Sequence, residues 1–389
     1  MNVLDRIASY AAELTELRQD FHAHPEIGFE ETRTSGIVAE KLKGWGIEVH
    51  RGIGGTGVVG VLQGRSGEGR RIGLRADMDA LPMEERTNLA YRSQNEGVFH
   101  GCGHDGHTTI LLGAARYLAE TRDFDGTAIF IFQPAEEGLG GARAMIADKL
   151  FERFPCDEIY GLHNAPDLPQ NHVSVFPGPA MAAADFFDIR IQGRGAHGAM
   201  PHLSNDPVII AITIAQALQS IASRNVNPLQ SLVLSITQIH SGSAYNIIPD
   251  EAVLAGTMRM FDDSVRKLAR QRMNEIASGI ASAYGAEAHV EIRDIFTVLE
   301  NREDPVQVIA EAAREVVGPG SVSTAPRPKM ASEDFADMLK LVPGAYFNLG
   351  MGNDVPVHNP GYLFDDEIIP VGASLFARII ETRTANSNS

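Results

Sequence analysis

The stretch Ala128-Ile129-Phe130-Ile131-Phe132-Gln133-Pro134-Ala135-Glu136-Glu137-Gly138 decides the fold class of this chain. Its first five residues form a continuous apolar run, which is typical of a central parallel strand that is buried on both faces. Two adjacent carboxylates, Glu136 and Glu137, follow where the strand ends. Open α/β sheets place their sites at the carboxyl ends of strands. The stretch therefore predicts an α/β fold with a polar site at one edge of its sheet.

The same pattern recurs in the first and last parts of the chain. Apolar strands are predicted at residues 71–75, 158–162 and 345–349, and amphipathic helices at residues 4–20 and 32–45. Each strand leads into a carboxylate or an imidazole, so we expect these side chains to converge. The expected strand-end groups are Asp77, Glu136, Glu137, His163 and His358.

A second polar stretch contains a thiol, three imidazoles and a carboxylate within nine residues. It is Phe99-His100-Gly101-Cys102-Gly103-His104-Asp105-Gly106-His107. Its glycines allow tight bends, and the apolar residues after it predict a buried helix. Thiolate, imidazole and carboxylate together suit zinc, cobalt, nickel or manganese. His22 and His24 are further candidates, although polar residues that support the site are the simpler interpretation for both.

Two neighbouring carboxylates can divide the work of a metal-dependent hydrolase. One of Glu136 and Glu137 can bind metal while the other stays free as a general base beside an activated water. These residues together predict a metal-dependent hydrolase. A glycine-rich stretch at residues 52–60 leads into a strand and not a helix, which favours hairpin turns over a dinucleotide-binding loop.

The middle of the chain has a different character and predicts a separate domain. Its strands and helices follow the order β-α-β-β-α-β, which suggests a ferredoxin-like domain inserted into the larger one. We therefore expect a discontinuous domain of residues 1–182 and 295–389 and an inserted domain of residues 183–294.

The inserted stretch carries its own candidate residues. His197, on a glycine-rich loop, could donate to a developing oxyanion, or it could be a loop histidine without a role. Asn246 and Arg259 flank the strand predicted at residues 252–256 and could hold a substrate carboxylate, the arginine through a bidentate pair.

Composition limits the partners and the compartment. The chain has 389 residues and a formal net charge of −17, so it has no basic excess with which to bind nucleic acid or an anionic membrane. Its cysteines are Cys102 and Cys156, which is typical of a reduced cytosolic protein. The N-terminal residues show no secretory signal, and no apolar run approaches the ~20 residues of a membrane span. We expect a cytoplasmic protein.

Several multi-residue motifs occur together and in order. They are Asp77-Met-Asp79-Ala-Leu-Pro, His100-Gly-Cys102-Gly-His104-Asp-Gly-His107, Gln133-Pro-Ala-Glu136-Glu137-Gly, His163-Asn164, Gly195-Ala-His197, Asn246-Ile-Ile-Pro249 and Val357-His358-Asn359. With them the sequence resembles, nearly end to end, the aminoacylase–carboxypeptidase family of metallo-amidohydrolases, in its hippurate hydrolase and auxin–amino-acid-conjugate hydrolase branch. One departure is that peptidase members carry His-x-Asp where this chain has Asp77-Met78-Asp79, so Asp77 is not expected to be a ligand.

The resemblance implies a zinc-exopeptidase-like mixed sheet flanked by helices, with an inserted ferredoxin-like lid and dimerisation domain. It also implies two divalent metal ions per subunit, of manganese, zinc, cobalt or nickel. The implied ligands are Cys102, as the bridge, with His104, Glu137, His163 and His358. Glu136 matches the general base, and His197 matches the residue that stabilises the oxyanion, in many members across a dimer interface. Asn246 and Arg259 match positions that hold the substrate carboxylate.

The expected function is metal-dependent hydrolysis of the amide bond of N-acyl-L-amino acids, such as N-acetyl, N-benzoyl or aryl-acetyl conjugates. A dipeptidase or carboxypeptidase with the same mechanism is the nearest alternative. A non-catalytic metal-binding protein on the same fold is a third, although the presence of Glu136 disfavours it. Relatives imply a homodimer, or a dimer of dimers, formed through the inserted domain.

Overall fold

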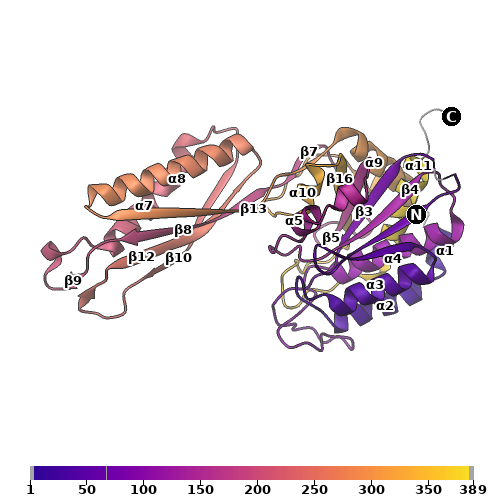
Figure 1. Ribbon diagram of the computed structural model, residues 1–389, viewed down its shortest axis with the longest axis horizontal. Helices are drawn as coiled ribbons and strands as arrows, with labels where there is room; N and C mark the ends of the chain where they lie inside the picture. The colour runs from indigo at the N-terminus through magenta and orange to yellow at the C-terminus, as the bar shows by residue number, and fades with distance from the viewer. Residues whose placement is uncertain (1–3, 67, 385–389) are drawn as a thin grey trace. The chain divides into compact units, whose positions relative to one another are not determined.

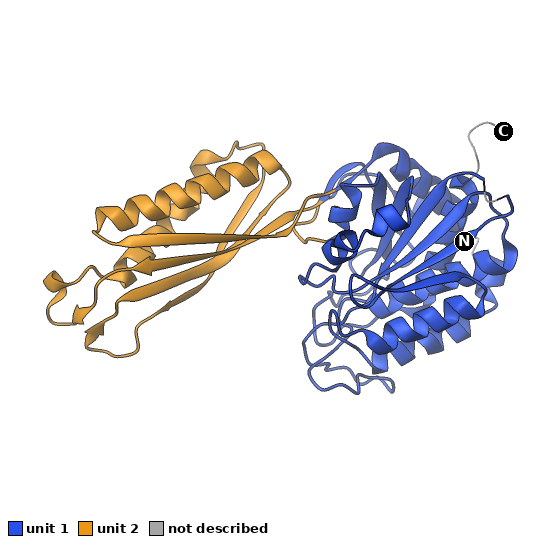
Figure 2. Cartoon of the chain, in the orientation of Figure 1, with its two compact units in different colours: residues 1–180, 300–327, 334–389 blue, residues 181–299, 328–333 orange. Residues whose placement is uncertain are grey.

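The computed structural model describes residues 4–66 and 68–384, and the N-terminal segment, in which we expect no secretory signal, lies partly outside these residues. The chain forms two compact units (Figure 2). Unit 1 comprises Met1–Ala180, Glu300–Arg327 and Asp334–Ser389, and unit 2 comprises Met181–Leu299 and Pro328–Glu333. Each unit has its own hydrophobic core.

A mixed sheet of eight strands forms the middle of unit 1. Its strands are β1 (Glu48–Ile53), β2 (Gly57–Gln63), β3 (Arg71–Asp77), β4 (Thr127–Gln133), β5 (Glu158–Ala165), β6 (Val173–Ser174), β15 (Val322–Ser323) and β16 (Gly344–Gly350). The strand order is β1-β2-β4-β3-β5-β16-β6-β15, with β4, β3, β5 and β16 parallel to one another (Figure 1). The carboxyl ends of these four strands therefore lie at one edge of the sheet.

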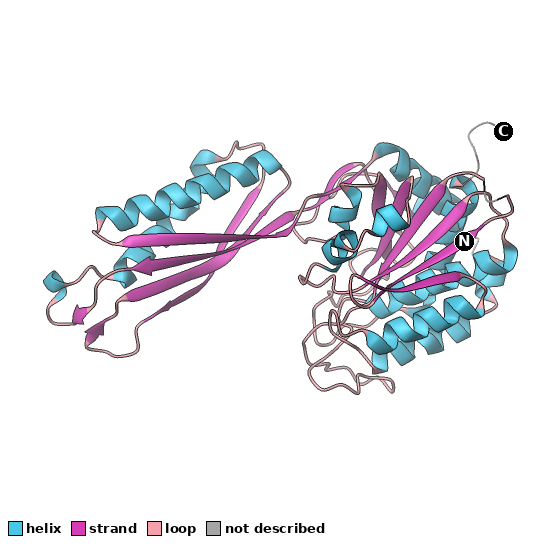
Figure 3. Cartoon of the chain, in the orientation of Figure 1, coloured by secondary structure: helices cyan, strands magenta, loops and turns pink. Residues whose placement is uncertain are grey.

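Helices cover this sheet (Figure 3). They are α1 (Asp5–Ala8), α2 (Ala11–Ala23), α3 (Thr32–Gly44), α4 (His104–Thr121), α5 (Gly141–Ala147), α6 (Leu150–Arg153), α9 (Glu303–Val316), α10 (Phe335–Leu339) and α11 (Ile369–Arg383), with short turns η3 (Pro319–Ser321) and η4 (Asp366–Ile368). The predicted mixed sheet flanked by helices is confirmed. The single helix expected at residues 4–20 is wrong, because the chain breaks at Ser9 and Tyr10, where the buried Tyr10 ring stacks under Arg116.

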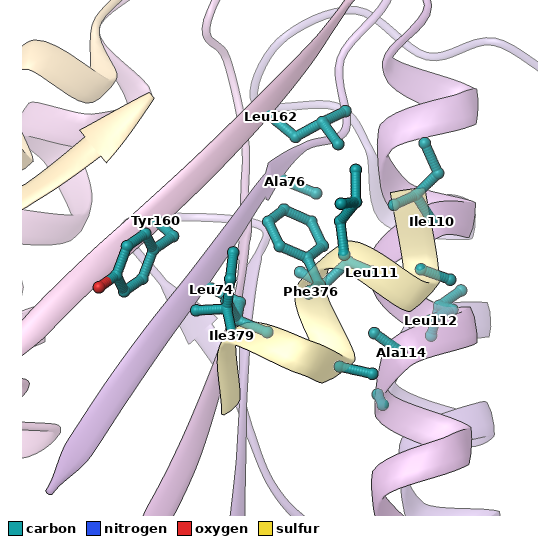
Figure 4. Close-up of a cluster of buried hydrophobic side chains, with 14 of the residues drawn as sticks. Leu74, Ala76, Ile110, Leu111, Leu112, Ala114, Tyr160, Leu162, Phe376 and Ile379 are labelled. Carbon is teal, nitrogen blue, oxygen red and sulfur yellow. The ribbon is translucent and has the colours of Figure 1, made fainter. Parts of the chain in front are cut away.

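The core beneath the site joins β3, α4 and α11 (Figure 4). Leu74 of β3, Leu111 of α4 and Phe376 of α11 are almost completely buried there. Each such side chain contributes about 1.5–3 kcal/mol when it leaves water. Because α4 begins at His104, this packing fixes the position of the residues that open the helix.

Unit 2 contains a four-stranded antiparallel sheet with two helices. Its elements are β8 (Ala183–Gln192), α7 (Pro207–Ser220), which continues into the π turn η2 (Ile221–Asn225), β10 (Leu232–Ser241), β12 (Glu251–Met260), α8 (Asp263–Ala283) and β13 (Glu287–Phe296). The strand order β10-β12-β8-β13 is that of a ferredoxin-like fold. Asp206 and Asp262 cap the two helices by accepting from Val208 and Ser264 N–H groups.

Smaller pairs of strands complete the structure. β9 (Ala196–His197) pairs with β11 (Ile247–Ile248), and β7 (Gly178–Met181) pairs with β14 (Leu299–Asn301). A short turn, η1 (Pro201–Leu203), follows β9.

One helix of the described chain is long and apolar enough to cross a membrane by length and composition, which the sequence analysis did not anticipate. It spans Pro207–Asn225, and 33% of its most apolar window is buried. Ile210, Ile214 and Leu218 on one face pack into the core of unit 2. A core helix passes the same test, so this helix is weak evidence for a membrane span.

Candidate active site

The loop before α4 presents Cys102 and His104 to the strand-end edge of unit 1. Gly103 has φ of 95°, in the left-handed region that favours glycine. A Cβ atom at this position would lie 2.3 Å from Asn164 Oδ1 and 2.7 Å from Tyr362 Oη. Only glycine therefore allows this bend, which places the thiol and the imidazole side by side.

The structure brings the five expected ligands into two groups that share Cys102. The first group is Cys102, His104 and His163, and the second is Cys102, Glu137 and His358. Within each group the candidate donor atoms all lie within 4.8 Å of one another. Glu136 forms a further group with His104 and Glu137, so the expected base is adjacent to both. A cysteine sulfur that belongs to both groups is the arrangement that a bridging ligand between two ions requires.

Unpaired polar atoms test whether metal ions fit these groups. His104 Nε2 and Glu137 Oε1 are buried and have no hydrogen-bond partner among the described residues. A buried polar atom left unsatisfied costs about 1–3 kcal/mol. His358 Nε2 lies 3.1 Å from Glu137 Oε1, but not in hydrogen-bond geometry. Divalent ions would satisfy these atoms, so the donor set fits them.

Neighbouring side chains orient the donors. Asp79 Oδ1 lies 3.2 Å from His104 Nδ1, and Asp79 Oδ2 accepts from the Glu137 N–H at 3.0 Å. His163 Nδ1 lies 2.6 Å from the Asn164 carbonyl oxygen, which leaves its Nε2 3.4 Å from Cys102 Sγ. Sequence reasoning assigned no role to Asp79. Its spacing from Asp77 is the missed indication, because residues two apart on an extended chain face the same side.

Other polar residues of the loop are already paired within the protein. His107 contacts Asp77 Oδ1 through Nδ1 at 2.6 Å and Asn164 Oδ1 through Nε2 at 2.7 Å. Asp77 also accepts from Arg75 Nη1 at 2.7 Å. Asp77, His104 and His107 could form another donor group by distance, but the pairing of Asp77 with His107 opposes this.

Supporting roles are also visible for the remaining loop residues. Asp105 accepts from Arg18 Nη1 at 3.3 Å and contacts His22 Nδ1 at 2.8 Å, so His22 supports the loop. His24 contacts the backbone oxygen of Asp20 at 2.9 Å. His100 is buried, and neither of its ring nitrogens is hydrogen-bonded within the described chain. Burial lowers the pKa of His100 to about 4, so its ring is neutral near pH 7 and gains a charge only in acid.

In the metal-free protein the donor cluster retains protons. Burial raises the pKa of the Cys102 thiol, with a contribution from Glu137. The nearby Cys102 and Glu137 side chains raise the pKa of His358 to about 10. Burial would lower the pKa of His104, but Asp77 and Cys102 outweigh it and raise this pKa well above its usual value. Metal binding should therefore release protons.

Unit 2 holds the remaining expected residues at two separate places. His197 lies on β9, and the Gly198 N–H donates to the Asn246 carbonyl at 2.7 Å, so His197 and Asn246 are neighbours. The Ala199 N–H donates to His197 Nδ1 at 3.1 Å.

Arg259 lies near the opposite end of β12, eight residues beyond Glu251, where the strand begins. At 3.3 Å per residue this separation is about 26 Å. Arg259 Nη1 donates to Ser332 Oγ at 2.7 Å, and burial lowers its pKa. We find no ion pair for Arg259 within residues 4–66 and 68–384.

Known proteins resemble this chain over nearly its full length. The sequence model of peptidase family M20/M25/M40 matches residues 73–382. A hippurate hydrolase of Campylobacter jejuni is 44% identical over 379 residues, which cover 97% of this chain and 98% of the relative. Thermostable carboxypeptidase 1 of Saccharolobus solfataricus is 38% identical over 370 residues, 92% of each chain. A dinuclear metal-binding M20 peptidase of Bacillus subtilis superposes with a TM-score of 0.84 at 33% identity, covering 97% of this chain and 99% of that one.

Proposed function

The chain belongs to peptidase family M20/M25/M40, and we propose that it is a metal-dependent amidohydrolase that cleaves N-acyl-L-amino acids to a carboxylic acid and a free amino acid. The observation that carries this proposal is the pair of donor groups sharing Cys102, with Glu136 beside them. The 44% identity to a hippurate hydrolase supports an N-acyl amino acid as the substrate class.

We assign two divalent ions to these groups. Cys102 would be shared by the two ions, with His104 and His163 holding one of them and Glu137 and His358 holding the other. Manganese, zinc, cobalt and nickel all accept this mixture of sulfur, nitrogen and oxygen donors. When bound, such ions polarise a carbonyl and lower the pKa of water towards neutrality.

The residues of the chain then perform the proton transfers. Glu136 is almost fully buried, takes a proton from the attacking water and delivers it to the leaving amine. His197 donates a hydrogen bond to the oxyanion that develops on the acyl carbon. Arg259, which has no carboxylate partner among the described residues, pairs with the carboxylate of the amino acid, and Asn246 assists there.

A second copy of the chain is part of this proposal. Arg259 lies about 26 Å along β12 from Glu251, and His197 and Asn246 lie in the segments that join β12 and its neighbour β8 at the Glu251 end, so one small substrate cannot span this distance. We therefore propose a homodimer, or a dimer of dimers, through unit 2, with His197 and Asn246 supplied by the partner. Exposed apolar side chains on α7 and on the edge strand β10 support this contact surface, among them Ile209, Ile212 and Ile239.

Mixing two inactive variants tests this arrangement. If His197 acts across the dimer, Glu136→Gln and His197→Ala chains should complement each other, because the hybrid keeps one intact site. An equal mixture, unfolded together and refolded, should recover about a quarter of wild-type activity. Each variant refolded alone serves as the control. A mixture as inactive as its components would place His197 in the site of its own chain.

A substrate panel tests the reaction class. Hydrolysis of N-acetyl and N-benzoyl amino acids should exceed that of dipeptides, in assays run with zinc, manganese, cobalt and nickel in parallel. Faster cleavage of dipeptides would favour the alternative peptidase function, to which the 38% identity with a carboxypeptidase points. Glu136→Gln should lower kcat by about 10²–10⁴-fold with metal content unchanged. A wild type as inactive as this variant would instead indicate a non-catalytic metal-binding protein.

We also propose a cytoplasmic location. Cys102 and Cys156 are both free thiols, as expected in a reducing compartment.

A further inference from the structure

The backbone that carries Glu136 and Glu137 has an unusual conformation. Ala135, between the end of β4 and Glu136, has φ of 54°, in the left-handed region that non-glycine residues avoid. Such a conformation persists only where the surroundings hold it in place, and it is found most often at functional sites. The contacts of Ala135 should therefore identify what determines the direction of the two carboxylates.

Three contacts hold Ala135. Its N–H donates to Glu31 Oε1 at 2.8 Å, and its carbonyl accepts from the Gly141 N–H at 3.0 Å. Its methyl group faces Gly28, where a Cβ atom would lie 2.8 Å from the Ala135 Cβ. Of the three, only the first contact comes from a side chain, so Glu31 is the one that substitution can remove cleanly.

Glu31 is costly to bury and has no evident structural purpose. Its side chain is fully buried, and no cation pairs with it in the described parts of the chain. Burial raises its pKa, and the nearby Asp79 adds to the effect. Helix α3 does not need Glu31 as a cap, because Glu26 accepts from the Arg33 and Thr34 N–H groups at 2.9 and 2.8 Å. Burying a carboxylate without a cation lowers the stability of a fold. We therefore expect Glu31 to serve the function of the protein.

The glycine-rich stretch at residues 52–60 supplies the second contact of Glu31. Thr56 Oγ1 donates to Glu31 Oε2 at 2.5 Å. A Cβ atom at Gly54 would lie only 2.5 Å from Met145 N of α5. Because Gly54 has no side chain, the loop can lie this close to α5 and make the contact with Glu31. The glycine-rich stretch therefore has a role other than nucleotide binding. Through Thr56 it holds the Glu31 side chain in contact with the Ala135 N–H.

We propose that Glu31 is a positioning residue that holds Ala135 in its left-handed conformation, and thereby directs Glu136 towards the reacting water and Glu137 towards the metal. The inference rests on the proposed roles of Glu136 and Glu137. Glu31 works together with Asp79, which holds the Glu137 N–H two residues further along the same turn. Its essential property is its reach to the Ala135 N–H, and not its charge.

Four variants distinguish the effect of the length of the Glu31 side chain, which reaches the Ala135 N–H, from the effect of its negative charge. Glu31→Gln keeps an acceptor at the same distance, so kcat should stay within threefold of wild type. Glu31→Asp keeps the charge but is one methylene shorter, and Glu31→Met removes the acceptor. Both should lower kcat by about 10–100-fold with KM within threefold, because a displacement of about 1 Å can cost 10²-fold. Glu26→Met, which removes the cap of α3, is the matched control and should lower thermal stability without changing kcat.

Adding Ala135→Gly to Glu31→Met should recover part of the lost kcat, because glycine adopts this φ without steric cost. If Glu31→Met does not fold, the comparison of Glu31→Gln with Glu31→Asp decides the question. An active Glu31→Asp with an impaired Glu31→Gln, or equal kcat in all Glu31 variants, would overturn the inference. A loss of kcat in Glu26→Met equal to that in Glu31→Met would do the same.

Titration with Co²⁺, followed by visible absorption, provides a readout that needs no turnover. Glu31→Asp and Glu31→Met should bind one of two Co²⁺ ions about tenfold more weakly, whereas Glu31→Gln and Glu26→Met should bind as wild type does. If the wild type cleaves nothing in the substrate panel, the proposed function fails while this titration still decides the role of Glu31. Unchanged Co²⁺ affinity in Glu31→Asp and Glu31→Met would then overturn it.

Discussion

Substitution of Gly103 by alanine should disrupt the site from its backbone. Two costs add at this position. The left-handed φ of 95° costs an alanine about 1–2 kcal/mol. The new methyl group must also displace the Asn164 side chain, whose Oδ1 would lie 2.3 Å from it. That amide contacts His107 Nε2 at 2.7 Å and donates to Tyr362 Oη at 2.8 Å, and losing both bonds costs about 2 kcal/mol.

The expected total for Gly103→Ala is therefore about 3–4 kcal/mol, which corresponds to a factor of roughly 10²–10³. Gly46→Ala is the matched control, because Gly46 has φ of 74° and an added Cβ would meet nothing within 4 Å. It should cost only the dihedral term of about 1–2 kcal/mol.

Urea unfolding followed by fluorescence measures both variants. Trp45 is the single tryptophan and lies in unit 1, so its emission reports on the unit that contains both glycines. Metal content, measured by elemental analysis, should fall in Gly103→Ala and stay at the wild-type level in Gly46→Ala. Equal losses of unfolding free energy in the two variants, with equal metal content, would refute the reasoning.

Three further substitutions probe separate parts of the site. Cys102→Ala should lower the content of both ions, because both donor groups include this thiol, and an unchanged stoichiometry would make the cysteine structural. Burial opposes ionisation of Asp105, but His100, His22 and Arg18 hold its pKa well below the unfolded value of about 3.9. The stabilising contribution of Asp105 is therefore present above pH ~4 and is lost as the pH falls further. In Asp105→Asn the free energy of unfolding should therefore fall less steeply as the pH is lowered below ~4. An unchanged dependence on pH in this range would contradict the prediction. Arg259→Met should raise KM at least tenfold for an N-acyl amino acid but not for its methyl ester, and equal effects on the two would exclude a carboxylate contact.

Local patterns in the sequence predicted much of the fold and the donor side chains that the structure brings together, because these depend on where strands end. The apolar run before Glu136 fixes both the strand and the edge at which its carboxylates emerge. The arrangement of the supporting residues depends instead on contacts between segments far apart in the chain. Glu31 and Ala135 are 104 residues apart, and no periodicity near either one indicates that they meet.

The separation of Asn246 from Arg259 was missed for a more local reason. The strand predicted at residues 252–256 stops at Gly256, which interrupts the apolar pattern. The structure continues β12 to Met260, with Gly256 opposite Phe187 of β8. A Cβ atom at Gly256 would lie 2.6 Å from the Phe187 ring, so the glycine makes room for that ring and does not end the strand. Alternation through Met258 and Met260 was the indication of the longer strand.

The donor side chains are held by the protein itself, which distinguishes this site from metal sites that fold only around their ion. His104 is oriented by Asp79, His163 by the backbone of Asn164, and the Glu137 backbone by Asp79 again. These contacts connect the ends of β3, β4 and β5 to the start of α4, whose packing on β3 and α11 involves no metal ligand. Small metal domains unfold without metal because they lack such a core. Chelation should therefore abolish turnover here while leaving the secondary structure in place, and restored metal should find its ligands already assembled.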